Sequence, residues 1–294
     1  MKIFAVIIII GALFILLPSG KKITRTAEPA NTPAKAAVRI KCNFYDEKDF
    51  RRSVMDAKNF DLPSAPLKGG IVPHHLLAGN IIASFFSTLS LQKPELVIVI
   101  APNHDGIGAN DIQTGSFSWE TPFGILDADL RTVKGLIDSK AAAENNDLMQ
   151  QDHSISGLVP YIKYYMPDAK IEPVMLRGSM STEKSVWLGN ELIKQARGRN
   201  FVVIASIDFS HYLPGSTADK MDEITLKAIK ERDLNSISNM GNDNLDSPPS
   251  LICFLSAMKA AGAENFDVAE HNNSDKLTGS KTNSTTSYFS MLFY

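Results

Sequence analysis

Four long apolar runs, separated by stretches with helical periodicity, dominate the middle of the chain. The apolar runs cover residues 69–75, 95–104, 170–178 and 201–211. Apolar runs without polar alternation are typical of parallel strands that are buried on both faces. The stretches with helical periodicity cover residues 76–90, 127–145, 155–166, 182–198 and 218–233. This alternation predicts an α/β fold of three layers, with a mostly parallel central sheet and helices on both faces.

The C-terminal part adds one predicted helix and one predicted strand. Apolar residues at helical spacing cover residues 249–263, and a polar stretch separates them from a last apolar segment, residues 285–294. Tyr, Ser, Leu and Phe alternate in that last segment, which favours a strand at the edge of the sheet.

The N-terminus differs from the rest of the chain. Residues 1–20 hold an unbroken apolar run from Ile3 to Leu17 with lysines on both sides, which predicts a signal peptide or an uncleaved signal anchor. Residues 21–38 are rich in Thr, Ala, Pro and Lys and are expected to form a disordered linker. One α/β domain is expected over residues 39–294. We therefore expect the protein to be exported, and either anchored to a membrane or secreted.

Composition excludes some classes of function. The formal net charge is −2 over 294 residues, and no basic stripe with interleaved aromatic residues indicates nucleic-acid binding. The two cysteines, Cys42 and Cys253, fit neither a disulfide framework nor a zinc ribbon. Two free thiols are expected, with a disulfide in an oxidising compartment as the alternative.

Histidines follow three of the predicted strands. His74 and His75 end the first apolar run, His104 the second, and His211 the fourth, with Asp208 close before it. Ligands of open α/β sheets bind at the carboxyl ends of the strands, so these side chains are expected to meet in one crevice. His153 stands at a predicted helix start, between Asp152 and Ser154, either of which could cap that helix.

Each histidine alone could be an ordinary hydrogen-bonded residue, but three strands that end alike favour a shared site. Imidazole and carboxylate together are the usual ligands of Zn, Fe, Mn or Cu. Without a metal, the same groups would form an acid–base cluster. Sequence motifs of other catalytic sites, such as a nucleophile elbow or a phosphate-binding loop, are missing from the chain.

Six short segments, in order, resemble motifs of the Memo-like proteins, known in prokaryotes as AmmeMemoRadiSam system protein B. The family's FYP, PHAGY and GPSH resemble Phe44-Tyr45-Asp46, Pro73-His74 and Ala101-Pro102-Asn103-His104. Its TPLG, EHSIE and SSDFCHW resemble residues 121–124, 152–156 and 206–212. In PHAGY, His75-Leu76-Leu77 replaces Ala-Gly-Tyr.

The resemblance implies a fold like that of the class III extradiol dioxygenases, in which two histidines and a carboxylate hold a non-haem Fe(II). It also implies an unknown small-molecule substrate, and radical-SAM and AMMECR-type proteins as partners. The implied function is that of a metal-binding protein, a non-haem iron oxidoreductase acting on a small organic substrate. A metal-dependent hydrolase and a non-catalytic scaffold are the alternatives.

The third metal ligand departs from the family pattern. The family has a cysteine in CGxxP, ahead of a helix that ends in Gly-Ala. Counted back without gaps from Gly262-Ala263, this position is Asp246, whereas Cys253 lies among core-type residues of the helix. The expected metal ligands are His74, His104 and Asp246, with the helix N-cap as the alternative role of Asp246.

This ligand set favours Fe(II), with Zn or Mn as alternatives, over Cu. His211, positioned by Asp208, is expected to act as an acid or base, and His153 to hydrogen-bond the substrate or a metal-bound water.

Overall fold

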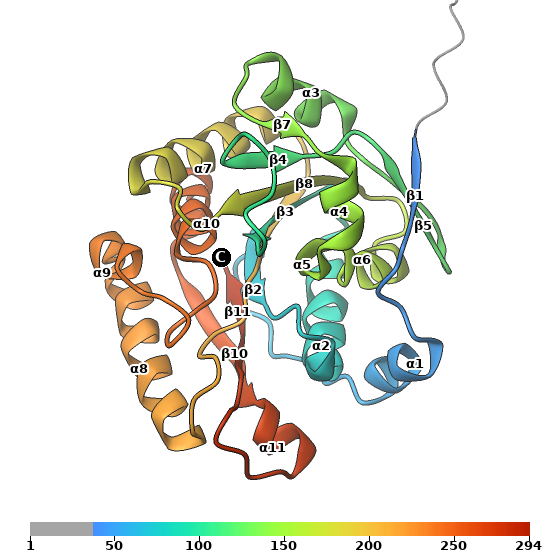
Figure 1. Cartoon of the computed structure of the whole chain (residues 1–294). Coiled ribbons are helices and arrows are strands. Elements are labelled where there is room, and N and C mark those ends of the chain that lie inside the picture. Colours follow the sequence, from blue (N-terminus) through green and yellow to red (C-terminus); the bar gives the residue numbers. More distant parts are fainter. Residues whose placement is uncertain (1–37) are drawn as a thin grey trace, which may run out of the picture. The chain divides into compact units, whose positions relative to one another are not determined.

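The computed structural model describes residues 38–294, as one compact unit (Figure 1). The predicted signal segment (1–20) and all but the last residue of the predicted linker (21–38) lie outside the described residues. Within residues 38–294, no helix is both long and apolar enough to cross a membrane.

An eight-stranded sheet forms the centre of the domain, in the order β10-β11-β2-β9-β3-β8-β4-β7. The four strands β2, β9, β3 and β8 run parallel to one another. Strand β11 pairs antiparallel with β10 and with β2, and β4 pairs antiparallel with β8 but parallel with β7. A second sheet has the order β1-β5-β6. The strands are β1 (Arg39–Lys41), β2 (Gly69–Val72), β3 (Leu96–Asn103), β4 (Ile112–Thr114), β5 (Ser118–Thr121), β6 (Gly124–Asp127), β7 (Ala143–Glu144), β8 (Lys170–Arg177), β9 (Phe201–Ser206), β10 (Phe266–Asn273) and β11 (Ser287–Phe293).

Helices cover both faces of the central sheet, as Figure 1 shows for α7 and α10 on one side and α2 and α6 on the other. The predicted three-layer α/β architecture is therefore confirmed. The helices are α1 (Glu47–Met55), the 3-10 helix η1 (Leu76–Ala78), α2 (Gly79–Ser90), α3 (Leu130–Asp138), α4 (Asn146–Gln151), α5 (His153–Ser156), α6 (Val159–Tyr165), α7 (Thr182–Ala196), α8 (Gly215–Glu231), α9 (Leu234–Ser238), α10 (Pro248–Ala261) and α11 (Ser274–Thr278).

Strand β3 shows why the apolar runs form the central strands. All eight of its residues are buried. Leu96, Ile98 and Ile100 belong to the hydrophobic cluster on one face, and Val97 and Val99 to the cluster on the other. Burying one such side chain stabilises the fold by about 1.5–3 kcal/mol. A run that is apolar at every position is therefore stable only between two layers of helices.

The edge position predicted for the last strand is wrong. Strand β11 lies between β10 and β2, and all seven of its residues are buried. The edge strand on this side of the sheet is β10, whose sequence FDVAEHNN is largely polar and half-exposed. Because the sequence of β10 is polar, a search for apolar runs does not find this strand. His271 lies on β10, where its ring stacks on Phe289 and its Nε2 is 2.7 Å from a carboxylate oxygen of the buried Asp222.

Helices α7 and α10 approach each other closely at Gly189. A Cβ atom at this position would lie 2.3 Å from the carbonyl oxygen of Cys253 and 2.9 Å from the amide nitrogen of Ala257. Both atoms belong to the backbone of α10, so a side chain at residue 189 has no flexible neighbour to displace. The close contact fixes α10, whose first turn follows directly after Asp246.

Gly189→Val is expected to lower the free energy of unfolding by about 3 kcal/mol, because it forces the two helices apart. Urea denaturation followed by circular dichroism measures this loss. The control is Gly178→Ala, where a Cβ atom would meet nothing within 4 Å. Equal urea midpoints for the two variants would contradict the close contact.

Candidate metal centre

The carboxyl ends of three neighbouring parallel strands bring the candidate residues together. His74 follows β2, His104 follows β3, and Ser206 ends β9, two residues before Asp208. The other two come from helix starts. His153 is the first residue of α5, and Asp246 directly precedes Ser247, the N-cap of α10.

The buried imidazole of His74 has a defined tautomer. Its side chain is 1% exposed, and its Nδ1 lies 3.1 Å from Ser206 Oγ. Ser206 donates its only hydroxyl proton to the carbonyl oxygen of Ser154, at 2.5 Å. Ser206 Oγ must therefore accept from His74 Nδ1–H, which leaves Nε2 as the ring nitrogen that faces the carboxylates. That nitrogen lies 3.2 Å from Asp246 Oδ2 and 3.6 Å from Asp208 Oδ2.

The imidazole of His104 is oriented by Asp152. Its Nδ1 lies 3.1 and 3.2 Å from the two carboxylate oxygens, and Asp152 also accepts from the backbone N–H of Ser154. Although burial opposes it, the hydrogen bond and charge of His104 hold the pKa of Asp152 down at about 2. The ionised carboxylate takes the Nδ1–H of His104, so its Nε2 is free, and it lies 3.9 Å from Asp246 Oδ2. Carboxylate–histidine pairs of this kind support metal ligands in many proteins.

Asp152→Asn is expected to weaken metal binding by about 10- to 100-fold, because a neutral amide makes His104 a poorer ligand. Isothermal titration with Zn²⁺ measures the affinity. Asn remains a good N-cap, so α5 should still form. The control is Asp129→Asn, which changes another buried N-cap aspartate, at the start of α3. Equal losses of affinity in both variants would contradict the orienting role of Asp152.

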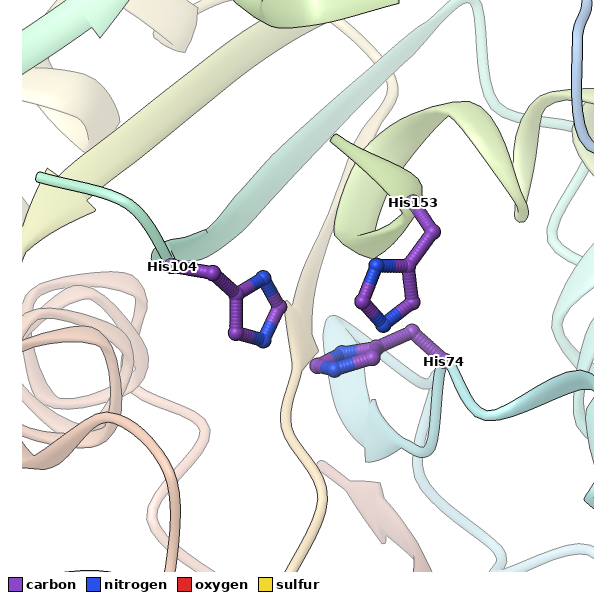
Figure 2. A group of neighbouring side chains, drawn as sticks. All are labelled: His74, His104 and His153. Carbon is purple, nitrogen blue, oxygen red and sulfur yellow. The ribbon is translucent and has the colours of Figure 1, made fainter. Parts of the chain in front are cut away.

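His153 brings a third imidazole to the same place. Its ring stacks on His104, with 4.7 Å between centroids, and meets the edge of His74 at 5.1 Å. Figure 2 shows the three rings facing one another. Burial, together with the neighbouring His74 and His104, lowers the pKa of His153 and keeps it neutral. One nitrogen of each ring lies within 4.8 Å of the others, so these three could hold a metal.

Two carboxylates complete the centre. Asp246 Oδ2 accepts from the backbone N–H of Asp208, while Asp246 Oδ1 is buried and has no hydrogen-bond partner among the described residues. Ligand atoms of His74, Asp208 and Asp246 lie within 4.8 Å of one another. Although burial opposes it, Asp208 and Asp246 raise the pKa of His74 to about 9, because the pocket favours a positive charge. A buried carboxylate oxygen without a donor and an excess of negative charge both fit a bound cation.

The structure decides the alternative roles of two residues. The N-cap of α10 is Ser247, whose Oγ accepts from the N–H of Ser250, so Asp246 does not cap this helix. Cys253 lies inside α10 with no exposed surface, and burial raises the pKa of its thiol. It is a core residue, as predicted. Both Cys42 and Cys253 are free thiols.

The predicted pairing of Asp208 with His211 is not found among the described residues. The Oδ1 atom of Asp208 instead accepts from the backbone N–H of His74, at 3.1 Å, which turns the carboxylate toward β2. His211 is held by its own backbone N–H, which donates to the carbonyl oxygen of Asn242. Its Nδ1 is buried without a partner among residues 38–294.

A cleft of about 770 Å³ lies beside the centre. Phe44 lines it, and the ring of Phe44 is 6.0 Å from that of His153. Leu76 and Leu77, which follow His75 in the chain, line it as well and are partly exposed. The walls of the cleft combine aromatic and aliphatic side chains with charged ones such as Asp49 and Arg52, and none of the candidate metal ligands lines it.

Comparison with known families decides which family the chain belongs to. A sequence model described as Memo-like protein matches residues 46–292. The chain belongs to the Memo-like family. A MEMO1 family protein of Pyrobaculum aerophilum is 33% identical over 237 residues, which cover 77% of this chain and 83% of that protein. A MEMO1 family protein of Thermotoga neapolitana is 33% identical over 171 residues, 56% of this chain and 61% of that protein.

A solved structure agrees with this placement at the level of the fold. The uncharacterized protein JW3007 of Escherichia coli K12 has a TM-score of 0.53 and 15% identity, over 76% of this chain and 99% of that one. The α/β architecture is consistent with the dioxygenase-like fold expected of a Memo-like protein.

Two residues of the Memo-like centre were missed as parts of the site. Asp152 was expected only as a helix cap, and Ser206 was given no role. Both are polar residues directly beside predicted strand ends or site histidines, which is the signal that could have found them.

Proposed function

We propose that this Memo-like protein binds one divalent transition metal ion through His74, His104 and Asp246. The orientation of the two imidazoles supports this proposal most directly. Ser206 and Asp152 take up both Nδ1–H groups, and both Nε2 atoms lie within 4 Å of Asp246 Oδ2. Two imidazoles and one carboxylate are a known ligand set of non-haem Fe(II). Fe(II) is therefore the favoured ion, with Zn, Mn or Cu as alternatives.

The proposed activity is that of a non-haem iron oxidoreductase acting on a small organic substrate. The bound ion would supply redox chemistry and polarise the substrate. The protein would provide the cleft, whose aromatic and aliphatic side chains would hold the apolar part of the substrate. Neutral His153 would hydrogen-bond the substrate, because its ring nitrogens have no partners among residues 38–294. His211, with its unpartnered Nδ1, would accept or donate a proton.

A metal-dependent hydrolase is the second candidate, and the three-histidine group favours it. His74, His104 and His153 form the type of ligand set that holds catalytic zinc in some hydrolytic and hydrating enzymes. In that case the ion would activate water, and the activity would not depend on oxygen.

The test is anaerobic purification of the full-length protein, followed by metal analysis and titration with Fe(II) and Zn²⁺. About one equivalent of bound metal is expected, and a tenth or less for every ion tested would reject the metal centre. Oxygen consumption with a panel of small phenols and diols then separates the two activities. Turnover that needs Fe(II) and oxygen supports the oxidoreductase, and Zn-dependent turnover without oxygen supports the hydrolase.

We further propose that residues 1–20 export the domain, so that the metal centre faces the outside of the cell. Protease treatment of intact cells tests this, since only an exported domain is degraded. Radical-SAM and AMMECR-type partners would then also have to be exported. Affinity purification of the full chain from membranes would test whether such proteins accompany it.

A further inference from the structure

We propose that His75 is a substrate-binding residue, which donates a hydrogen bond from Nε2–H to an oxygen acceptor on the substrate. Tyr288 is the positioning residue that fixes its tautomer. The acceptor would be a carboxylate, carbonyl or phenolate oxygen that lies next to the metal-binding atoms. This inference rests on the proposed function, in which the substrate binds at the metal centre.

The tautomer of His75 follows from the hydroxyl of Tyr288. Tyr288 lies on β11 with no exposed surface, and its hydroxyl oxygen is 2.7 Å from His75 Nδ1. The hydroxyl of Ser274 is also a neighbour of this group, but its Oγ already accepts from the backbone N–H of Thr286 and pairs with Thr285 Oγ1. A buried hydroxyl group must place its proton on an acceptor, and His75 Nδ1, at 2.7 Å, offers a close one. His75 Nδ1 therefore accepts, and Nε2 carries the proton.

The side chain of His75 has no structural role that would explain this arrangement. His75 is the N-cap residue of η1, yet its side chain makes no capping hydrogen bond. The residue is exposed, unlike His74 before it. A buried tyrosine therefore fixes one nitrogen of an exposed imidazole, while the other nitrogen remains free to meet a ligand.

The backbone places His75 next to the metal centre, and the two residues that follow it line the cleft. Asp208 Oδ1 accepts from the N–H of His74 at 3.1 Å and lies 3.5 Å from the N–H of His75. On the other side, Leu76 and Leu77 line the cleft. The segment from His74 to Leu77 therefore connects the metal centre with the wall of the cleft, and His75 lies between the two along the chain.

A fixed N–H donor selects substrates by a simple rule. A substrate with an oxygen acceptor gains a hydrogen bond, whereas an analogue without one leaves the donor poorly paired. His75 would therefore act on specificity, through the binding of the substrate, and not on the metal itself. Tyr288→Phe keeps the shape of the ring and removes only the hydroxyl, so it tests the positioning role separately.

The first measurement is the tautomer, read from long-range ¹H–¹⁵N spectra of the full-length protein with and without added Zn²⁺. We expect Nε2–H for His75 in the wild type, and a mixture of tautomers in Tyr288→Phe. The control is Tyr164→Phe, an exposed tyrosine on α6, which should leave the spectrum of His75 unchanged. A protonated Nδ1 in the wild type, or no change in Tyr288→Phe, would overturn the assignment.

The second measurement compares the affinities for catechol and 3,4-dihydroxybenzoate. Both offer two hydroxyl groups to a metal, but only the second adds a carboxylate acceptor. The wild type should bind 3,4-dihydroxybenzoate about tenfold more tightly, as one hydrogen bond to a charged group allows. His75→Ala should remove this preference, and His75→Gln, which keeps an N–H donor, should restore part of it.

The outcomes separate this inference from the proposed function. An unchanged preference in His75→Ala, with full metal content, would overturn the role of His75 and leave the metal centre intact. The role of His75 would also be overturned if catechol, 3,4-dihydroxybenzoate and acetate all leave the His75 Nε2–H signal of the metal-loaded wild type unchanged. A wild type that binds no metal would instead refute the proposed function, while the tautomer measurement would still stand by itself.

Discussion

Asp246→Ala will lose the transition metal that the wild type binds, falling from about one equivalent to a tenth or less. The reason is the position of the carboxylate, whose Oδ2 lies 3.2 Å from His74 Nε2 and 3.9 Å from His104 Nε2. Its other oxygen is buried and has no partner among the described residues. Removal of the carboxylate takes away one of three ligands and much of the negative charge of the pocket, and a loss of at least about 100-fold in affinity is expected.

The control variant is Cys253→Ala. The family pattern has a cysteine at the ligand position, and Cys253 is the one cysteine of α10. Its thiol lies in the core, so Cys253→Ala should bind metal as the wild type does. Asp246→Cys should bind metal again, but with a shift from Fe(II) toward Zn or Cu(I), because thiolate is a softer ligand. Metal analysis by mass spectrometry measures all three variants. Full metal content in Asp246→Ala, or its loss in Cys253→Ala, would disprove the assignment.

Glu172→Gln will make the protein more stable at alkaline pH. Glu172 lies on β8 with no exposed surface, and neither carboxylate oxygen has a hydrogen-bond partner among residues 38–294. Burial raises its pKa from 4.5 to about 8, against the opposing effects of Thr132 and Arg199. The folded protein therefore keeps this carboxyl group protonated at neutral pH, where the unfolded chain ionises it.

The sign of the pH effect follows from this raised pKa. Below pH 4.5 the carboxyl group is protonated in both the folded and the unfolded protein, and it makes its full contribution to the stability of the fold. As the pH rises toward 8, only the unfolded state gains from ionisation, so the wild type loses stability relative to Glu172→Gln. The difference should reach roughly 4 kcal/mol in favour of the glutamine variant at pH 8, and vanish near pH 4.

Urea denaturation at several pH values measures this difference. Glu223→Gln, which changes an exposed carboxylate on α8, serves as the control and should follow the wild type. A difference in free energy of unfolding between Glu172→Gln and the wild type that stays constant from pH 4 to pH 8 would show that Glu172 is ionised in the folded protein.

The apolar strands could be predicted from the sequence because burial on both faces requires an apolar residue at nearly every position. Strands β2, β3, β8 and β9 are apolar at nearly every position, and their parallel order brings His74, His104 and Asp208 to one edge. Strand β10 could not be found in this way. Its side chains alternate with no clear apolar face, and its pairing with β11 depends on tertiary contacts.

The candidate site was predictable in its residues but not in its hydrogen bonds. Asp246 was found by counting back along the helix, although its alternative role as a cap could be excluded only by the position of Ser247. The partnership of Asp152 with His104 joins residues 48 positions apart, and no local pattern encodes it. The orientation of Asp208 toward β2 is also a tertiary effect, which is why its predicted pairing with His211 failed.

The unequal exposure of the two histidines also has a kinetic consequence. His74 is 1% exposed, whereas His104 is 31% exposed, so the centre is more open to solvent on the side of His104. An ion held by both residues would leave His74 only after its bond to the more exposed His104 is broken, so its exchange should be slow. The metal found in the protein would then reflect the ion that was available when the chain folded. The cellular compartment in which loading takes place, more than equilibrium affinity, would decide which metal the protein carries.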